Sequence, residues 1–186
     1  VRGTVGLAGD KSISHRYALL AALATGRSTI HQYSLGADCA ATLDCLTNAG
    51  IEIGKTGSPE RGLTVEIAGR GLRGLRPSAA PFDARNSGTT MRLLSGVLAA
   101  HSFTSVVMGD ASLSRRPMGR VIVPLEQMGA RSESHDKRPP LTIHGAALRG
   151  IRYRTEVPSA QVKSAILLAG LQADGASVVE ESAATR

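Results

Sequence analysis

An apolar run at helical spacing occurs three times in this chain of 186 residues. The three runs begin at Leu19, Leu93 and Leu167, so each lies 74 residues from the next. A short polar segment precedes each run, and a segment rich in Ser, Thr and Val follows it, which favours a helix followed by a strand. A shared period of this length predicts repeated supersecondary units.

Further elements complete the first two units. Second helices are predicted over residues 38–46 and 118–127, the latter after a proline that suits a helix start. Gly50 and Gly129 follow these helices as C-terminal caps. Two short strands then close each unit: residues 51–53 with 63–67, and 130–133 with 141–143. With residues 1–7 as an opening strand, the expected unit is β-α-β-α-β-β.

The units cover about residues 1–70, 82–145 and 151–186, which predicts one α/β (α+β) domain. The third unit contains only its first helix and the following strand before the sequence stops. We therefore expect a truncated third unit and an incomplete single domain. Val1 is not a natural start, so we expect the N-terminus to be trimmed as well.

Composition restricts the ligand class. The chain has 22 Lys and Arg against 15 Asp and Glu, a net charge of +7, so anionic partners are expected. Only 3% of the residues are aromatic and the basic residues do not form runs, which argues against a nucleic-acid platform. Single cations beside Gly and Ser suit small phosphorylated ligands better.

Two cysteines, Cys39 and Cys45, lie six residues apart on one predicted helix and face different sides of it. We interpret them as small core residues of a reduced, cytoplasmic protein, with neither a disulfide nor a metal site. The sequence shows no signal-peptide core and no transmembrane run, so no membrane partner is expected.

The first polar tip, residues 9–16, combines a helix start with positive charge. Asp10 or Ser12 can cap the helix, and Lys11 and Arg16 add charge beside its free backbone N–H groups. Such a tip can hold a phosphate or a carboxylate. A capped surface helix with solvated charges is the alternative. We expect His15 to be a hydrogen-bonded residue of the helix start rather than a catalytic group.

The second tip, residues 83–92, carries Gly88, which allows a ligand close to the backbone, and Asn86, which can cap or donate. Arg92 either faces a ligand or pairs with Asp83 or another acid. Arg116 belongs to a basic turn that either binds carboxylate or phosphate or is solvated.

The third tip, residues 157–164, offers Ser159 as an N-cap and Gln161 as a polar side chain. Residues 134–140 are polar and predict a hairpin loop.

Together these tips resemble those of the 5-enolpyruvylshikimate-3-phosphate (EPSP) synthases, enolpyruvyl transferases of the shikimate pathway. The matching motifs are residues 9–16, 86–92, 116–118 and 159–165, in family order over nearly the whole chain. The resemblance implies two domains, each of three β-α-β-α-β-β units, with helix N-termini facing the cleft between them. This chain looks like most of one domain, and the second domain is absent from it.

The resemblance also implies a reaction. The enolpyruvyl group passes from phosphoenolpyruvate to the 5-hydroxyl of shikimate 3-phosphate, giving EPSP and phosphate, without a metal or organic cofactor. The family's acidic general base lies in the other domain. We therefore expect the chain alone to bind shikimate 3-phosphate weakly and not to turn over.

Site residues carried over from the family fall on all three tips, and Lys11 is the expected catalytic residue because it contacts both substrates and could donate a proton. Ala160 replaces a serine of some members. Gly88 falls where some glyphosate-tolerant members have alanine, so sensitivity to glyphosate is expected. The shikimate 3-phosphate set is Lys11, Ser12, Arg16, Ser159, Ala160, Gln161 and Arg186, with Thr185 beside it, and the phosphoenolpyruvate set is Lys11, Asn86, Gly88, Arg116 and Gln161.

Two alternatives remain. A UDP-N-acetylglucosamine enolpyruvyl transferase would share the fold, but residues 11–16 argue against it. A non-catalytic basic domain that binds anions or nucleic acid is the other alternative.

Overall fold

A computed structural model of the chain describes residues 2, 9–58, 62–181 and 183. It confirms the predicted order of helices and strands in the second unit, and in the third unit as far as that unit extends. The predicted opening strand at residues 1–7 falls on residues that, Arg2 apart, lie outside the described part. The elements are α1 (Lys11–Leu23), β1 (Thr25–Tyr33), α2 (Ala37–Asn48), β2 (Glu52–Ser58), β3 (Gly62–Arg70), β4 (Phe82–Asp83), α3 (Gly88–Leu98), β5 (Thr104–Met108), η1 (Leu113–Arg115), α4 (Gly119–Met128), β6 (Arg131–His135), β7 (Arg138–His144), β8 (Arg152–Arg154), α5 (Ala160–Gly170) and β9 (Val178–Glu180).

The strands of the described residues form three sheets, one for each unit. The first has the order β1-β3-β2 and is antiparallel, with Ile53 opposite Ile67 as the closing-strand prediction requires. The second has the order β4-β5-β7-β6, in which only β4 and β5 are parallel. The third pairs β8 with β9, again in parallel. The second and third units therefore open in the same way.

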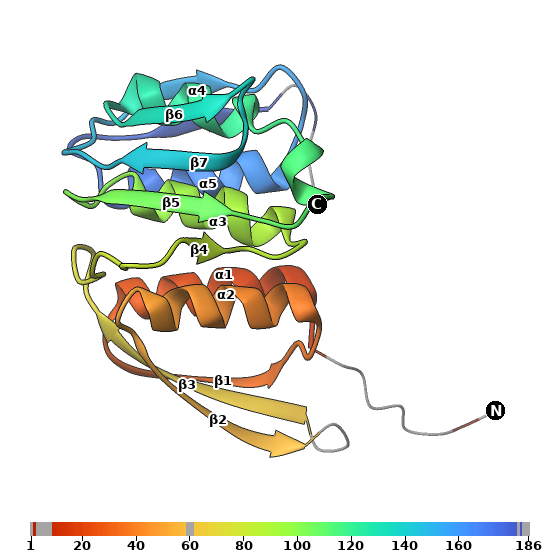
Figure 1. Cartoon of the computed structure of the whole chain (residues 1–186). Helices are drawn as coiled ribbons and strands as arrows, with labels where there is room; N and C mark the ends of the chain where they lie inside the picture. The colour runs from red at the N-terminus through yellow and green to blue at the C-terminus, as the bar shows by residue number, and fades with distance from the viewer. Residues whose placement is uncertain (1, 3–8, 59–61, 182, 184–186) are drawn as a thin grey trace.

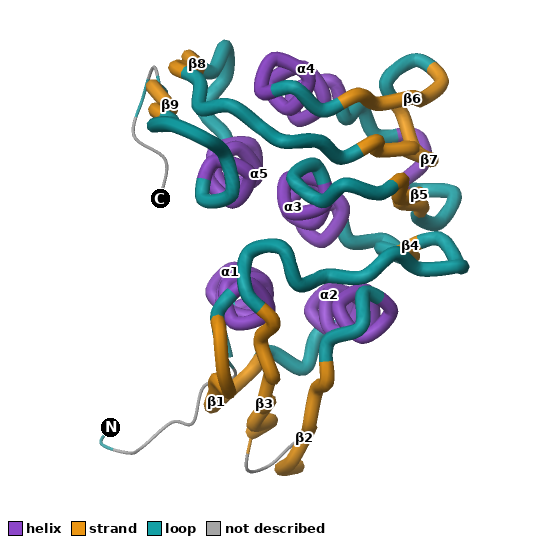
Figure 2. Tube along the Cα trace, turned by 90° about the vertical axis from the view of Figure 1, so that its left-hand side faces the viewer, coloured by secondary structure: helices purple, strands orange, loops and turns teal. Residues whose placement is uncertain are grey.

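The helices pack together between the sheets. Seen end-on, they form a bundle with the three sheets on separate sides of it (Figure 2). Helix α3 packs against both α1 and α5, while α2 lies beside α1 and α3, and α4 lies beside α3 and α5. The helices α1, α3 and α5 all begin at the right-hand end in Figure 1. Repetition of one unit thus brings three helix N-termini to one face.

An aliphatic core holds this arrangement together, as the composition predicts. The contact between α3 and α5 is close, because a Cβ added at Gly96 would lie 2.2 Å from the carbonyl oxygen of Ala165. Cys39 and Cys45 are buried and have free thiols, and burial raises the pKa of Cys45 to about 12. They are core residues, as expected.

The hairpin of the second sheet differs from its prediction. The expected loop over residues 134–140 is wrong in extent, because β6 runs to His135 and β7 starts at Arg138. Asp136 and Lys137 make the turn with φ values of 51° and 54°. Two consecutive left-handed residues form a tight hairpin turn that suits the twist of the strands.

Within the described part of the chain, none of the helices has the length and apolar character to span a bilayer.

Candidate active site

The three helix tips are each capped by a side chain. Asp10 Oδ1 accepts a hydrogen bond from the Ile13 amide at 2.7 Å, and so caps α1. Ser87 caps α3 and Ser159 caps α5 in the same way. The caps fix where each helix begins and leave other first-turn N–H groups without a partner in the helix. These groups point toward the surface formed by the starts of α1, α3 and α5, which we call the shared face. Such N–H groups favour negative charge.

Arg16 joins the tips of α1 and α5. Its Nε donates to Ser164 Oγ at 3.0 Å, and one terminal nitrogen donates to the carbonyl oxygen of Ala160 at 3.2 Å. The other terminal nitrogen donates to the carbonyl oxygen of Ser12, 2.9 Å away on its own helix. All three acceptors are neutral, so the guanidinium is held in place while its charge stays uncompensated by them.

Gln161 joins the tips of α5 and α3. Its Nε2 donates to Thr89 Oγ1 at 2.9 Å, and its Oε1 accepts from Arg92 Nη1 at 2.9 Å. The same Arg92 nitrogen donates to the carbonyl oxygen of Gly88. The predicted alternative for Arg92, an ion pair with Asp83, is not what these contacts show, and Asp83 instead accepts from the Arg85 amide. Arg92 therefore faces the shared face.

Gly88 lies beneath two guanidinium groups. A Cβ at this position would lie 2.5 Å from Arg92 Nη1 and 3.4 Å from Arg116 Nη1. Burial, followed by the charges of Arg116 and Arg120, lowers the pKa of Arg92. Cations held side by side in this way favour binding of an anion such as a phosphate or carboxylate.

Asn86 orients Arg116. Its Oδ1 accepts from Arg116 Nη2 at 3.2 Å, and its Nδ2 donates to Asp110 Oδ2 at 2.6 Å. The hydrogen bonds from Asn86 and from the Leu113 amide lower the pKa of Asp110, so that this carboxylate is ionised and fixes the Asn86 amide. Asn86 therefore acts through its side chain and does not cap α3.

Lys11 pairs with Asp38 at the start of α2. Both side chains retain solvent exposure, so the pair sits at the surface of the shared face. An acid in the first turn of a helix is favoured by the helix dipole, which accounts for Asp38 at this position.

A cavity of about 510 Å3 opens beside these groups, between α3, α4 and α5. Arg92, Arg120 and Lys137 place cations along it, and Glu156 is an acid in its lining. Ser159 and Gln161 of the third tip also line it. The cavity has the charge to accept an anionic group.

The structure thus brings the three predicted tips together, while Thr185 and Arg186 lie outside the described residues. Sequence reasoning did not identify Asp38, Asp110 or Thr89 as members of this cluster. Asp38 and Asp110 could have been noticed as acids at a helix start and in a turn. Thr89 lies within the matching motif of residues 86–92, but the motif does not indicate its contact with Gln161.

His15 is buried and its Nδ1 lies 2.6 Å from Thr42 Oγ1, as expected of a hydrogen-bonded residue of the helix start.

Comparisons with known proteins agree with this geometry. The family model described as EPSP synthase (3-phosphoshikimate 1-carboxyvinyltransferase) matches residues 1–186. Relatives named 3-phosphoshikimate 1-carboxyvinyltransferase include one from Solibacter usitatus, 51% identical over 100% of this chain and 43% of its own length. Another, from Geobacillus kaustophilus, is 50% identical over 97% of this chain and 42% of its own.

Among solved structures, an EPSP synthase from Acinetobacter baumannii superposes with a TM-score of 0.91 and 44% identity, covering 99% of this chain and 41% of that one. The chain therefore spans about two fifths of the length of these relatives. The match confirms the expected enolpyruvyl transferase fold. The chain belongs to the EPSP synthase family.

Proposed function

We propose that the protein containing this chain transfers the enolpyruvyl group of phosphoenolpyruvate to the 5-hydroxyl of shikimate 3-phosphate and releases phosphate. The observation that carries the proposal is the convergence of three capped helix tips whose arginines donate to neutral acceptors. Two polyanions can be held side by side on such a face. The names of the relatives favour this reaction over a UDP-N-acetylglucosamine transferase and over a non-catalytic basic domain.

The two substrates fit different junctions of the face. We assign the junction of α1 and α5 to shikimate 3-phosphate, because Arg16 is fixed there beside Ser12 and Ala160. Phosphoenolpyruvate is assigned to the start of α3, where the guanidinium groups of Arg92 and Arg116 lie against Gly88. The remaining proposed ligands are Lys11, Ser159, Gln161 and Arg186 for the first substrate, and Lys11, Asn86 and Gln161 for the second.

In the proposed chemistry, the methylene carbon of phosphoenolpyruvate is protonated while the 5-hydroxyl of shikimate 3-phosphate attacks the adjacent carbon. The resulting tetrahedral intermediate then expels phosphate and loses a proton from its methyl group, which restores the carbon–carbon double bond of the enolpyruvyl product. Lys11 is the proposed proton donor, and the arginines stabilise charge on the reacting groups. The general base is proposed to come from a second domain.

The test is phosphate release from the two substrates, by this chain alone and with the remaining family sequence, which is the rest of this domain and the second domain, supplied as a separate polypeptide. We expect turnover only on complementation. Lys11→Met should abolish it, whereas the matched control Lys55→Met should not, because Lys55 also lies near an aspartate, Asp44, but outside the tips. Turnover by the chain alone would contradict the placement of the general base.

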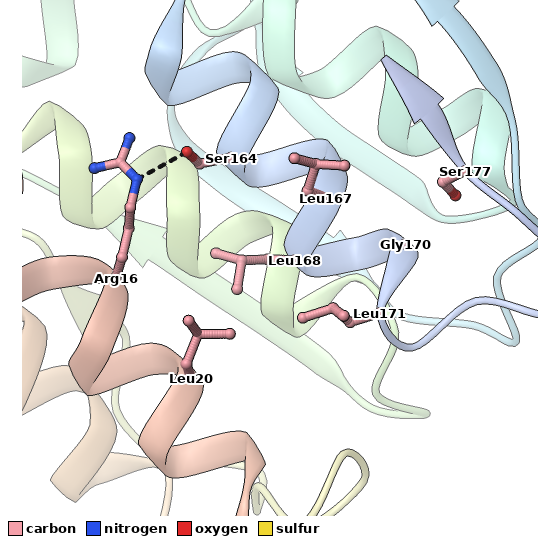
Figure 3. A pocket seen from close by; sticks show the side chains of 8 residues that line it. All are labelled: Arg16, Leu20, Ser164, Leu167, Leu168, Gly170, Leu171 and Ser177. Carbon is pink, nitrogen blue, oxygen red and sulfur yellow. Dashed lines mark hydrogen bonds between the residues drawn. The ribbon is translucent and has the colours of Figure 1, made fainter. Parts of the chain in front are cut away.

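We also propose that the third unit continues beyond the described elements. A groove of about 450 Å3 lies between α1 and α5, lined by Leu20, Leu167 and Leu171 (Figure 3). These leucines are exposed. By contrast, α2 packs against both α1 and α3, and α4 packs against both α3 and α5, so the equivalent junctions between those helices are covered. By this symmetry, the second helix of the third unit would cover the groove.

Gly88 supports a further proposal, inhibition by glyphosate. The guanidinium groups of Arg92 and Arg116 lie against this glycine, so an anionic competitor of phosphoenolpyruvate would meet the same two cations. Full activity in glyphosate well above the phosphoenolpyruvate concentration would contradict this.

The buried free thiols of Cys39 and Cys45 support a reducing location, for which we propose the cytoplasm, with neither nucleic acid nor a membrane as partner.

A further inference from the structure

A buried chain of polar side chains connects α1, α2 and α3 beneath their tips. His15 Nδ1 lies 2.6 Å from Thr42 Oγ1, which lies 2.7 Å from Thr90 Oγ1. Thr90 Oγ1 in turn lies 2.8 Å from Ser87 Oγ, the cap of α3, and 3.1 Å from the carbonyl oxygen of Asp38. All four side chains are buried, with His15 and Ser87 at 0% exposure.

The hydrogen bonds of this chain have a defined direction. Thr90 Oγ1 donates its single proton to Ser87 Oγ or to the carbonyl oxygen of Asp38, so in either case it must accept from Thr42. Thr42 has then used its proton and accepts from His15, which places the imidazole proton on Nδ1. Nε2 of His15 keeps a lone pair and has no hydrogen-bond partner among the described residues.

The surroundings of His15 keep it neutral. Burial, followed by the charge of Lys11, lowers its pKa to about 4, with a smaller contribution from Arg16. Asp38 on α2 acts in the opposite direction, and α3 contributes the neutral Thr90. A second proton on Nε2 would be buried beside two cations without an acceptor.

We propose that His15 is a positioning residue for enolpyruvyl transfer, which fixes α1 relative to α3 through Thr42 and Thr90. Lys11 and Arg16 flank it on α1, while Ser87 at the other end immediately precedes Gly88. This chain of hydrogen bonds therefore joins the tip of α1, which is assigned to shikimate 3-phosphate, to the start of α3, which is assigned to phosphoenolpyruvate. The inference rests on the proposed function, because misalignment of two bound substrates reduces the rate of their reaction.

The experiment uses the full-length protein. His15→Leu and Thr42→Val should each lower kcat about tenfold to a hundredfold, with both KM values within about twofold, because each substrate still meets its own tip. The double variant should lose little more, because either change breaks the same chain. His15→Asn should restore most of kcat, since its amide nitrogen can donate to Thr42 as Nδ1 does.

Ile67→Val is the matched control, because Ile67 is fully buried in the first sheet. Shortening its side chain lowers the stability of the protein but changes none of the hydrogen bonds between His15, Thr42, Thr90 and Ser87. Its kcat per folded molecule should equal that of the unaltered protein. Unchanged kcat in His15→Leu, or a loss that Ile67→Val shares, would overturn the positioning role.

A readout independent of turnover separates this inference from the proposed function. Nitrogen-15 NMR of the unaltered protein should show His15 neutral at pH 7 with its proton on Nδ1. A charged ring, or a proton on Nε2, would overturn the hydrogen-bond chain even in an active enzyme. If His15 shows the expected tautomer but the protein does not catalyse enolpyruvyl transfer, the proposed function and the positioning role are both wrong. The hydrogen-bonded chain would then have a purely structural role.

Discussion

At the scale of single residues, the start of α3 is defined by what Gly88 lacks. The guanidinium of Arg92 occupies the space in which a side chain would lie, and that of Arg116 lies next to it. A cation pair of this kind becomes favourable when an anion lies between or beside the charges. The absence of a Cβ is therefore a requirement of the site and not only of the backbone.

Gly88→Ala tests this requirement. The added methyl group would lie 2.5 Å from Arg92 Nη1, so the guanidinium must move. We expect the KM for phosphoenolpyruvate to rise about tenfold or more, while the KM for shikimate 3-phosphate changes little. Steady-state kinetics of the full-length protein measure both. Gly54→Ala is the control, because a Cβ there meets nothing closer than 3.8 Å, and an equal rise in that variant would contradict the explanation.

His15 predicts a dependence of stability on pH. Its folded-state pKa of about 4 lies below the ordinary value of 6.5. Between pH 4 and pH 6.5 the imidazole is therefore protonated in the unfolded state but neutral in the folded state. Its contribution to stability is complete above pH 6.5 and is lost as the pH falls to 4, by about 3 kcal/mol in total. Unfolding of the protein and of His15→Asn at pH 7 and pH 4 isolates this contribution. A stability difference between them that does not change with pH would contradict it.

At the scale of elements, the position of each helix start decides which groups reach the shared face. Helix α1 begins at Lys11 because Asp10 caps it, so that the lysine lies in the first turn. Moving this boundary would move Lys11 relative to Asp38.

Asp10→Ala should remove the cap and destabilise the protein by about 1 kcal/mol. Asp10→Asn should retain most of the stability, because asparagine caps a helix equally well. Thermal unfolding compares the two. Equal losses in both variants would attribute the effect to the charge of Asp10 rather than to its hydrogen bond with the Ile13 amide.

The elements were also the part of the fold that the sequence predicted best, because helical and strand periodicity and capping residues are local signals. The hairpin loop at residues 134–140 was predicted too long, because its two-residue turn uses Asp136 and Lys137, and non-glycine residues at positive φ give little local signal. At the site, the tips were predicted from motifs, yet the contacts of Arg92 with Gln161 and of Asn86 with Asp110 were not. Those pairs are far apart in sequence and meet only through packing of different helices and loops.

At the scale of the whole molecule, the repeat leaves one side of the helix bundle uncovered. The groove between α1 and α5 exposes Leu167 and Leu171 (Figure 3). Burying such side chains contributes about 1.5–3 kcal/mol each, so a covering helix would add substantially to stability.

Cysteine labelling tests whether the groove is covered. Leu167→Cys should react with a maleimide in this chain alone and be protected in the full-length protein. Leu72→Cys, of nearly equal exposure at 45% against 44%, is the comparison site and should react in both. The native thiols give little background because both are buried. Equal labelling of Leu167→Cys in the two proteins would contradict coverage by a further helix.

The arginines of the shared face donate to neutral oxygens, and this has a consequence for the speed of encounter. Arg16, Arg92 and Arg116 keep a field that reaches into solution. Anions diffusing nearby are drawn toward such a face, and capture becomes faster than unguided collision. Added salt shortens the reach of that field to about 10 Å at 0.1 M. Anionic ligands should therefore associate with the shared face faster in dilute salt, where the field steers them, than in concentrated salt, where association depends on unguided collision.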